Sequence, residues 1–114
     1  MIKIVLLAAL LIPAPALAVR PLDLAVYASS EFDAATTYRA VRSCGAACIE
    51  ANPILRPIAG NPAIFFALGG TAWLANREAR YLREHGHGRW ARAVQVLTVG
   101  MHVFAGASNI MVAK

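Results

Sequence analysis

The stretch that decides the fold is residues 62–113, which read "PAIFFALGGTAWLANREARYLREHGHGRWARAVQVLTVGMHVFAGASNIMVA". Two long apolar segments flank a short turn that contains Gly86 and Gly88. The first segment, 62–82, would be about 30 Å long as a helix, which matches the hydrocarbon core of a bilayer if its arginines extend to the interface. The second segment, 91–113, has a similar length. This stretch therefore predicts a transmembrane helical hairpin that turns at the glycines.

The composition favours a membrane protein. The chain has 114 residues, of which 59% are hydrophobic and 15% charged, and its mean hydropathy is +0.56. A chain of this length forms one domain, and so apolar a composition lies above the range that is usual for soluble proteins. The predicted fold class is therefore all-α, a small helical membrane protein.

Arginines cluster at the predicted hairpin turn. Residues 77–92 contain five arginines and two glutamates, whereas residues 47–61 contain only Arg56. The positive-inside rule therefore places the turn in the cytoplasm. Topology and contact with anionic lipid headgroups account for such a cluster, so no nucleic-acid binding is predicted.

Residues 1–18, "MIKIVLLAALLIPAPALA", have the pattern of a secretory signal peptide. A basic start, a short apolar run and small residues before a cleavage site are typical of such segments. The predicted organisation is a signal peptide at 1–18 and a single helical membrane domain at 19–114. The mature N-terminus would then lie outside the bacterial cytoplasmic (inner) membrane. The alternative is that residues 1–18 remain attached as an anchor.

Residues 21–43 follow a helical pattern but carry five charged side chains. Each charge costs about 2.5–3.5 kcal/mol at the centre of a membrane helix, whereas a Leu or Val returns only about 0.3–0.6 kcal/mol. This segment cannot insert by itself. It is predicted to be an amphipathic helix at the outer interface, or a membrane-embedded helix that packs against the hairpin and so satisfies its polar groups.

Small side chains recur at every fourth position of the first hairpin segment. They are Ala63, Ala67, Thr71, Ala75 and Ala79. Such a stripe lets another helix approach closely. Its expected partner is the side of the last segment that carries Gly100, Ala105 and Gly106, or a second copy of the chain.

A set of polar side chains forms a candidate site near the membrane. Its members are Asp33, Thr36, Thr37, Glu50, Asn52, His102 and Asn109. His102 falls near the middle of its segment, where an unpartnered polar group is costly, so it is expected to face protein or water. One interpretation is that these residues form structural hydrogen bonds between helices.

The other interpretation is that Asp33, Glu50 and His102 converge as metal ligands or as an acid and base pair. Their spacing matches no metal or catalytic motif. No catalytic residue, metal site or cofactor is therefore assigned.

Cys44 and Cys48 stand in "SCGAAC", just before the loop that contains Glu50. In the predicted orientation this loop lies outside the membrane, where thiols tend to be oxidised, so the two residues are predicted to form a local disulfide. A catalytic redox pair is disfavoured because the spacing is not C-x-x-C.

The segments "DAATT" at 33–37 and "IEANPIL" at 49–55 resemble an uncharacterised family of small bacterial membrane proteins. Its members look like short helical bundles with an Asp and Thr helix, a Glu-x-Asn-Pro loop, and a His or Asn in the final helix. The matching residues are Asp33, Thr37, Glu50, Asn52, Pro53, His102 and Asn109. The resemblance extends over about 24–112 and implies no activity. This chain departs from the pattern in its more charged first helix and in its two cysteines.

The expected function is that of a small integral membrane protein that acts as a structural or accessory component through helix contacts. Its expected partners are membrane lipids and another membrane protein or a second copy of itself. The alternative is a membrane-embedded, metal-dependent hydrolase that uses Asp33, Glu50 and His102. A periplasmic thiol redox module is the least favoured possibility.

Overall fold

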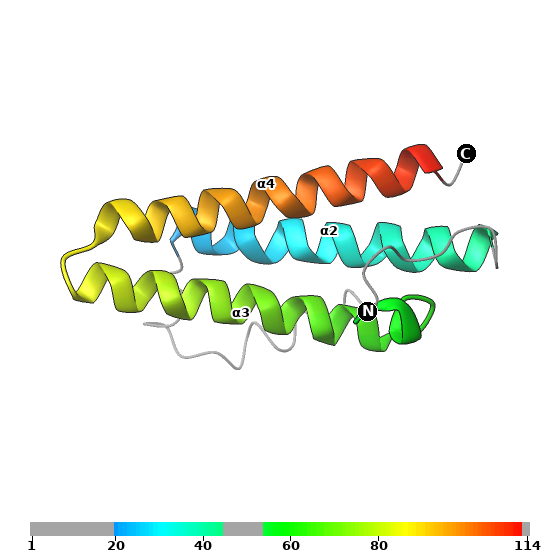
Figure 1. Cartoon of the computed structure of the whole chain (residues 1–114), viewed down its shortest axis with the longest axis horizontal. Helices are drawn as coiled ribbons and strands as arrows, with labels where there is room; N and C mark the ends of the chain where they lie inside the picture. The colour runs from blue at the N-terminus through cyan, green and yellow to red at the C-terminus, as the bar shows by residue number, and fades with distance from the viewer. Residues whose placement is uncertain (1–19, 45–53, 113–114) are drawn as a thin grey trace.

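The computed structural model describes residues 20–44 and 54–112. These residues form three long helices and one short 3-10 turn, and they contain no strand (Figure 1). The elements are α2 (Pro21–Cys44), η3 (Arg56–Ile58), α3 (Ala63–Glu84) and α4 (Gly88–Val112). The prediction of an all-α chain is therefore confirmed for the described residues.

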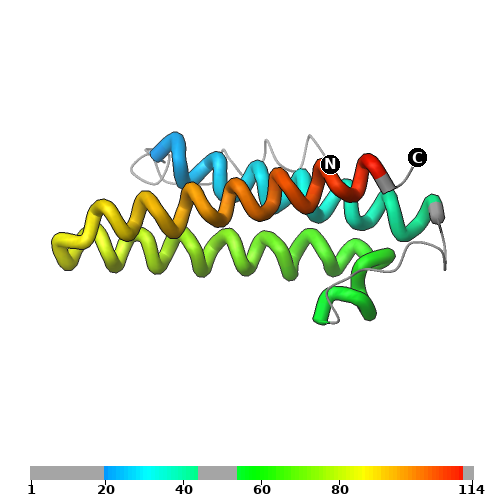
Figure 2. Tube along the Cα trace, turned by 45° about the horizontal axis from the view of Figure 1, so that its top comes forward, coloured from blue at the N-terminus to red at the C-terminus, as the bar shows by residue number. Residues whose placement is uncertain are grey.

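The three helices form a bundle in which each helix packs against the other two. Helices α3 and α4 are joined by residues 85–87 and run in opposite directions, as the hairpin prediction requires (Figures 1 and 2). Helix α2 lies alongside the hairpin and begins toward the end of the bundle that carries the α3–α4 turn (Figures 1 and 2). It is 24 residues long, close to the 22 residues of α3 and the 25 of α4.

The helix ends follow from local sequence signals. The side-chain oxygen of Asn61 accepts a hydrogen bond from the backbone N–H of Ala63 at 2.9 Å, and Pro62 has no N–H to leave unpaired. At the other end of α3, Gly86 adopts a φ of +80°, a backbone conformation that only glycine adopts readily. The hairpin therefore begins and turns where the Asn-Pro pair and the glycine predict.

The interior of the bundle is built from small side chains. Most of the buried apolar residues are alanines, and Ile64 and Val26 are the largest fully buried apolar side chains among the described residues. Around Ala34, Ile64 and Leu68 lie four partly buried side chains: Tyr38, Leu55, Ile58 and Phe65. Small side chains allow the helix backbones to approach one another closely.

The buried face of α3 shares only Ala79 with the predicted stripe and otherwise lies one residue further along. It comprises Ile64, Leu68, Ala72, Asn76 and Ala79. Thr71 is exposed, and Gly106 lies against the ring of Phe32 on α2 and not against α3. The expected contact of Gly106 with α3 was therefore wrong, because this part of α4 packs against α2.

Large apolar side chains lie on the outside of the bundle, most clearly on α4. Phe104 is 76% exposed and Met111 is 74% exposed, and Leu97 and Met101 are also largely exposed. Among the described helices, one is long and apolar enough to cross a membrane by length and composition, at Gly88–Met111. Little of that span is buried inside the bundle.

Candidate functional site

A line of hydrogen-bonded side chains, here called the α2–α4 seam, joins those two helices. Its residues are Asp33, Thr36, Thr37, His102 and Asn109. Asp33 and Thr37 are four residues apart on α2, and His102 and Asn109 are seven apart on α4, so each pair lies on one helix face. Helices α2 and α4 run in the same direction, so the two faces stay in register along the seam.

The buried half of the seam is a pair formed by a carboxylate and an imidazole. Oδ2 of Asp33 lies 2.8 Å from Nδ1 of His102, and Oδ1 of Asp33 accepts a hydrogen bond from the hydroxyl of Thr37 at 3.3 Å. Asp33 is 9% exposed and His102 is 7% exposed. Because a carboxylate accepts hydrogen bonds, this geometry assigns the donated proton to Nδ1 of His102. Asp33 thereby fixes the orientation of the imidazole.

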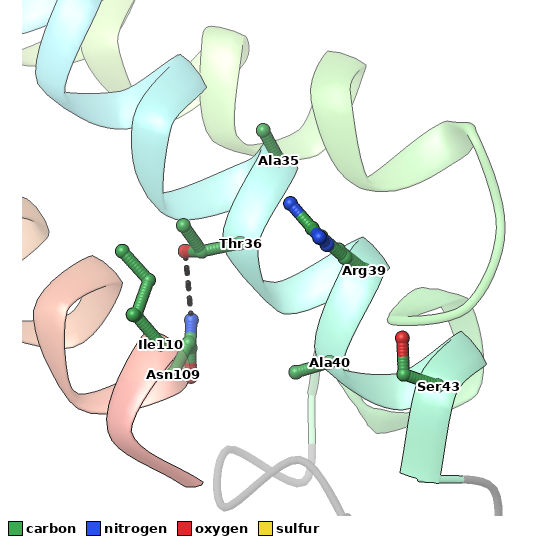
Figure 3. A pocket seen from close by; sticks show the side chains of 7 residues that line it. All are labelled: Ala35, Thr36, Arg39, Ala40, Ser43, Asn109 and Ile110. Carbon is green, nitrogen blue, oxygen red and sulfur yellow. Dashed lines mark hydrogen bonds between the residues drawn. The ribbon is translucent and has the colours of Figure 1, made fainter. Parts of the chain in front are cut away.

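The outer half of the seam opens into a pocket between the ends of α2 and α4. The amide nitrogen of Asn109 donates a hydrogen bond to Thr37 at 2.7 Å. It donates a second one to Thr36 at 3.1 Å (Figure 3). The pocket has a volume of about 400 Å³. Besides Thr36 and Asn109, it is lined by Ala35, Arg39, Ala40, Ser43 and Ile110. The α2–α4 seam is therefore buried at Asp33 and His102, and it is open to the pocket at Asn109.

The structure brings together five of the seven residues of the candidate site. Glu50 and Asn52 lie outside the described residues, so their position relative to the α2–α4 seam is not described. Cys44 ends α2, and Cys48 also lies outside the described residues. The predicted disulfide therefore stays a prediction.

A second polar network lies at the end of the bundle near the α3–α4 turn, and the sequence reasoning did not identify it. Gln95, which is 1% exposed, donates hydrogen bonds to the carboxylate of Asp23 at 2.5 Å and to the side-chain oxygen of Asn76 at 3.0 Å. Asn76 donates to the backbone carbonyl of Asp23 at 3.1 Å, and Arg83 donates to Gln95 at 3.3 Å. The network therefore joins all three helices.

A periodicity in the sequence could have revealed Gln95. It stands seven residues before His102 and fourteen before Asn109, so the three side chains lie on one face of α4. Asn76 continues the four-residue line of Leu68 and Ala72 on α3. Extending these two helix faces toward the arginine-rich residues 77–92 would have included the side-chain amides of Gln95 and Asn76.

The two networks satisfy the polar groups that they bury. Every buried side-chain nitrogen and oxygen of the described residues has a hydrogen-bond partner. Within residues 20–44 and 54–112, no three His, Cys, Asp or Glu side chains are grouped so that they could hold a metal ion. The described geometry is therefore that of helix-joining hydrogen bonds. A metal site that also uses Glu50 stays a prediction.

Comparisons with protein-family models, with curated proteins and with solved structures give no match for this chain. The resemblance to an uncharacterised membrane family accordingly stays a prediction. The described residues form a bundle of three helices that buries two polar networks among small apolar side chains and exposes large apolar side chains, most clearly on α4. Its function is argued below from that arrangement.

Proposed function

We propose that this chain is a small integral protein of the bacterial cytoplasmic membrane, in which all three helices lie together in the bilayer. It acts as a structural or accessory component that contacts lipids and another membrane protein, or a second copy of itself, through its outer helix faces. The observation that carries this proposal is the placement of side chains: large apolar groups on α4 face outward, and Asp33, His102 and Gln95 face inward.

The cost of exposing large apolar side chains to water favours a bilayer around the bundle. Burying a large apolar side chain is worth about 1.5–3 kcal/mol, so a soluble bundle that leaves Leu97, Met101, Phe104 and Met111 exposed forgoes several such contributions. In a bilayer these side chains contact acyl chains at no cost. Polar side chains at membrane depth must instead find partners within the protein, as Asp33 and His102 do.

The same argument applies to two of the five charges of α2, those of Asp23 and Asp33. Asp23 and Asp33 both point toward partners on other helices. Their hydrogen bonds form when α2 packs against the hairpin, so the insertion cost of the isolated segment overstates the cost in the bundle. We therefore propose that α2 is embedded beside the hairpin and does not lie flat on the membrane surface.

The orientation follows from where α2 begins. Arg20 lines the same pocket as Arg83 and Gly88, so in a spanning bundle the start of α2 and the α3–α4 turn share one side of the membrane. A cleaved signal peptide would deliver residue 19 to the outer side, whereas the positive-inside rule places the turn in the cytoplasm. For a spanning bundle these two sequence arguments therefore oppose each other.

We propose that the arginine-rich end is cytoplasmic and that the end carrying Ser43 and the Glu50 loop is outside. Lysines and arginines are more numerous at the arginine-rich end, which has Arg20 besides the five of residues 77–92. This orientation requires that residues 1–18 do not deliver residue 19 to the outer side, contrary to what a secretory signal would do. It keeps the loop with Cys48 in the oxidising compartment.

Membrane extraction tests the proposal. Membranes from cells that produce the full chain are washed with alkaline carbonate, which releases peripheral proteins, and then with detergent. The proposal expects the chain to stay in the carbonate pellet and to dissolve in detergent. Recovery in the soluble or carbonate fraction would show that the apolar exterior is covered by something other than lipid.

Cysteine labelling tests the orientation in the same cells. His87→Cys in the turn and Ser43→Cys at the opposite end are each placed in a chain whose two native cysteines are replaced by serine. A membrane-impermeant maleimide is expected to label position 43 in intact cells and position 87 only after permeabilisation. The reverse pattern would support a cleaved signal peptide with the arginine-rich end outside.

A further inference from the structure

We propose that the hollow at the arginine-rich end of the bundle is a binding site for a phosphate group, the headgroup phosphate of an anionic lipid in the membrane setting proposed above. This hollow, here called the arginine pocket, has a volume of about 520 Å³. It is lined by Arg20, Pro21, Leu22, Arg83, Gly88, Arg92 and Gln95. Among the residues that the structure describes, its lining includes three guanidinium groups and no carboxylate.

The three arginines come from three separate parts of the chain. Arg20 immediately precedes α2, Arg83 lies in the last turn of α3, and Arg92 lies near the start of α4. Only the packing of all three helices brings them to one hollow. The pocket is therefore a product of the tertiary fold and differs from a run of basic residues along one segment.

Arg83 is held in position while the other two arginines are left for a ligand. Its Nη1 donates to Oε1 of Gln95 at 3.3 Å, and its Nη2 lies 3.8 Å from Oδ1 of Asp23. Within the described part of the chain, Arg20 and Arg92 have no ion-pair partner. One carboxylate thus stands against three guanidinium groups, so the pocket keeps a net positive charge.

A phosphate group is the anion that suits this arrangement. Guanidinium groups bind phosphate oxygens through paired N–H donors, and the tetrahedral anion can accept from several of them at once. The positive end of the α4 dipole, at Gly88, adds to the attraction. In the membrane setting proposed above, this end of the bundle lies at the depth of the lipid headgroups, where phosphate is abundant.

The test uses the purified full chain in a nonionic detergent and three soluble probes. They are dioctanoyl phosphatidylglycerol, dioctanoylglycerol with the same acyl chains but no phosphate, and inorganic phosphate. Binding is followed by titration calorimetry. The proposal expects saturable binding of at least one phosphate probe and clearly weaker binding of dioctanoylglycerol. Equal affinity for the two lipids, or no saturable binding of either phosphate probe, would overturn it.

Charge-removing variants separate a defined site from general attraction. Arg20→Gln and Arg92→Gln should each weaken phosphate binding about fivefold, since one surface arginine contributes on the order of a fivefold factor to anion binding. Arg89→Gln is the matched control, because Arg89 is exposed in the same part of α4 but does not line the pocket. It should weaken binding less than about twofold. An equal loss in all three variants would overturn the proposal.

The same measurements identify the source of the phosphate. Tighter binding of phosphatidylglycerol than of inorganic phosphate assigns the pocket to a lipid headgroup, and equal binding assigns it to free phosphate. Carbonate extraction tests the membrane proposal independently of these binding measurements. A chain that is recovered in the soluble fraction but binds inorganic phosphate in an Arg92-dependent way would keep the arginine pocket while refuting the membrane setting.

Discussion

Replacing Asp33 by alanine removes the centre of the α2–α4 seam. The carboxylate accepts one bond from His102 on the neighbouring helix and one from Thr37 on its own helix, so only the first bond joins two helices. Hydrogen bonds between membrane helices contribute about 0.6 kcal/mol on average and up to about 1.7 kcal/mol. Because this bond is short and involves a carboxylate, we expect a loss of about 1–2 kcal/mol in the free energy of unfolding.

The assay is unfolding of the full chain in detergent micelles by added dodecyl sulfate, followed by far-ultraviolet circular dichroism. Glu31→Ala is the matched control, because it removes an exposed carboxylate two residues away on α2, and it should not destabilise the bundle. Asp33→Ala combined with His102→Ala should cost about 1 kcal/mol less than the sum of the single changes. Equal effects of Asp33→Ala and the control, together with strict additivity, would refute the reasoning.

Three further predictions concern packing, the second network and metal. Gly106→Ala would place a methyl group against the ring of Phe32 and should destabilise the bundle by about 1–3 kcal/mol. Gly100→Ala is the control and should not destabilise it, because no neighbour lies within 4 Å of the added methyl group. A Gly106→Ala chain as stable as the original would contradict the contact between α2 and α4. Gln95→Leu leaves the buried side chains of Asp23 and Asn76 without this partner and should lower the free energy of unfolding by about 1–3 kcal/mol in the same assay. An unchanged free energy of unfolding would mean that the second network does not stabilise the bundle. Elemental analysis of the purified chain should find no stoichiometric metal; about one metal per chain would support the hydrolase alternative.

The helices of the hairpin were predictable because their signals are local. Asn61 and Gly86 act through their own backbone and immediate neighbours, and long apolar runs leave few alternatives to a helix. The predicted segments 62–82 and 91–113 lie close to α3 and α4, and each end differs by no more than three residues. Differences of this size are ordinary at helix ends.

The face that each helix buries was only partly predictable. A periodic pattern places residues on a common face, and this sufficed for His102 and Asn109 and for Asp33 and Thr37. It does not say which of two adjacent stripes meets a neighbouring helix. On α3 the buried stripe is the one that contains Asn76, whose amide reaches partners on both other helices, and that choice depends on tertiary packing.

The path of α2 could not be read from the sequence alone. Its charges disfavour insertion when each residue is considered by itself, and only the partners on α3 and α4 show that Asp23 and Asp33 face inward. The position of Arg20 beside Arg83 and Gly88 has the same origin. Because α2 begins beside the α3–α4 turn, a cleaved signal peptide and the positive-inside rule predict opposite orientations for a spanning bundle.

The most direct test of the central claim is to determine what surrounds the outer face of α4. A spin label at Met101→Cys, in a chain without its native cysteines and reconstituted into vesicles, reports collisions with oxygen and with a water-soluble nickel chelate. Met101 is 66% exposed and lies near the middle of the span Gly88–Met111. The account predicts frequent collisions with oxygen and few with nickel, as expected for a label among acyl chains. Frequent collisions with nickel would place this face in water and contradict the account.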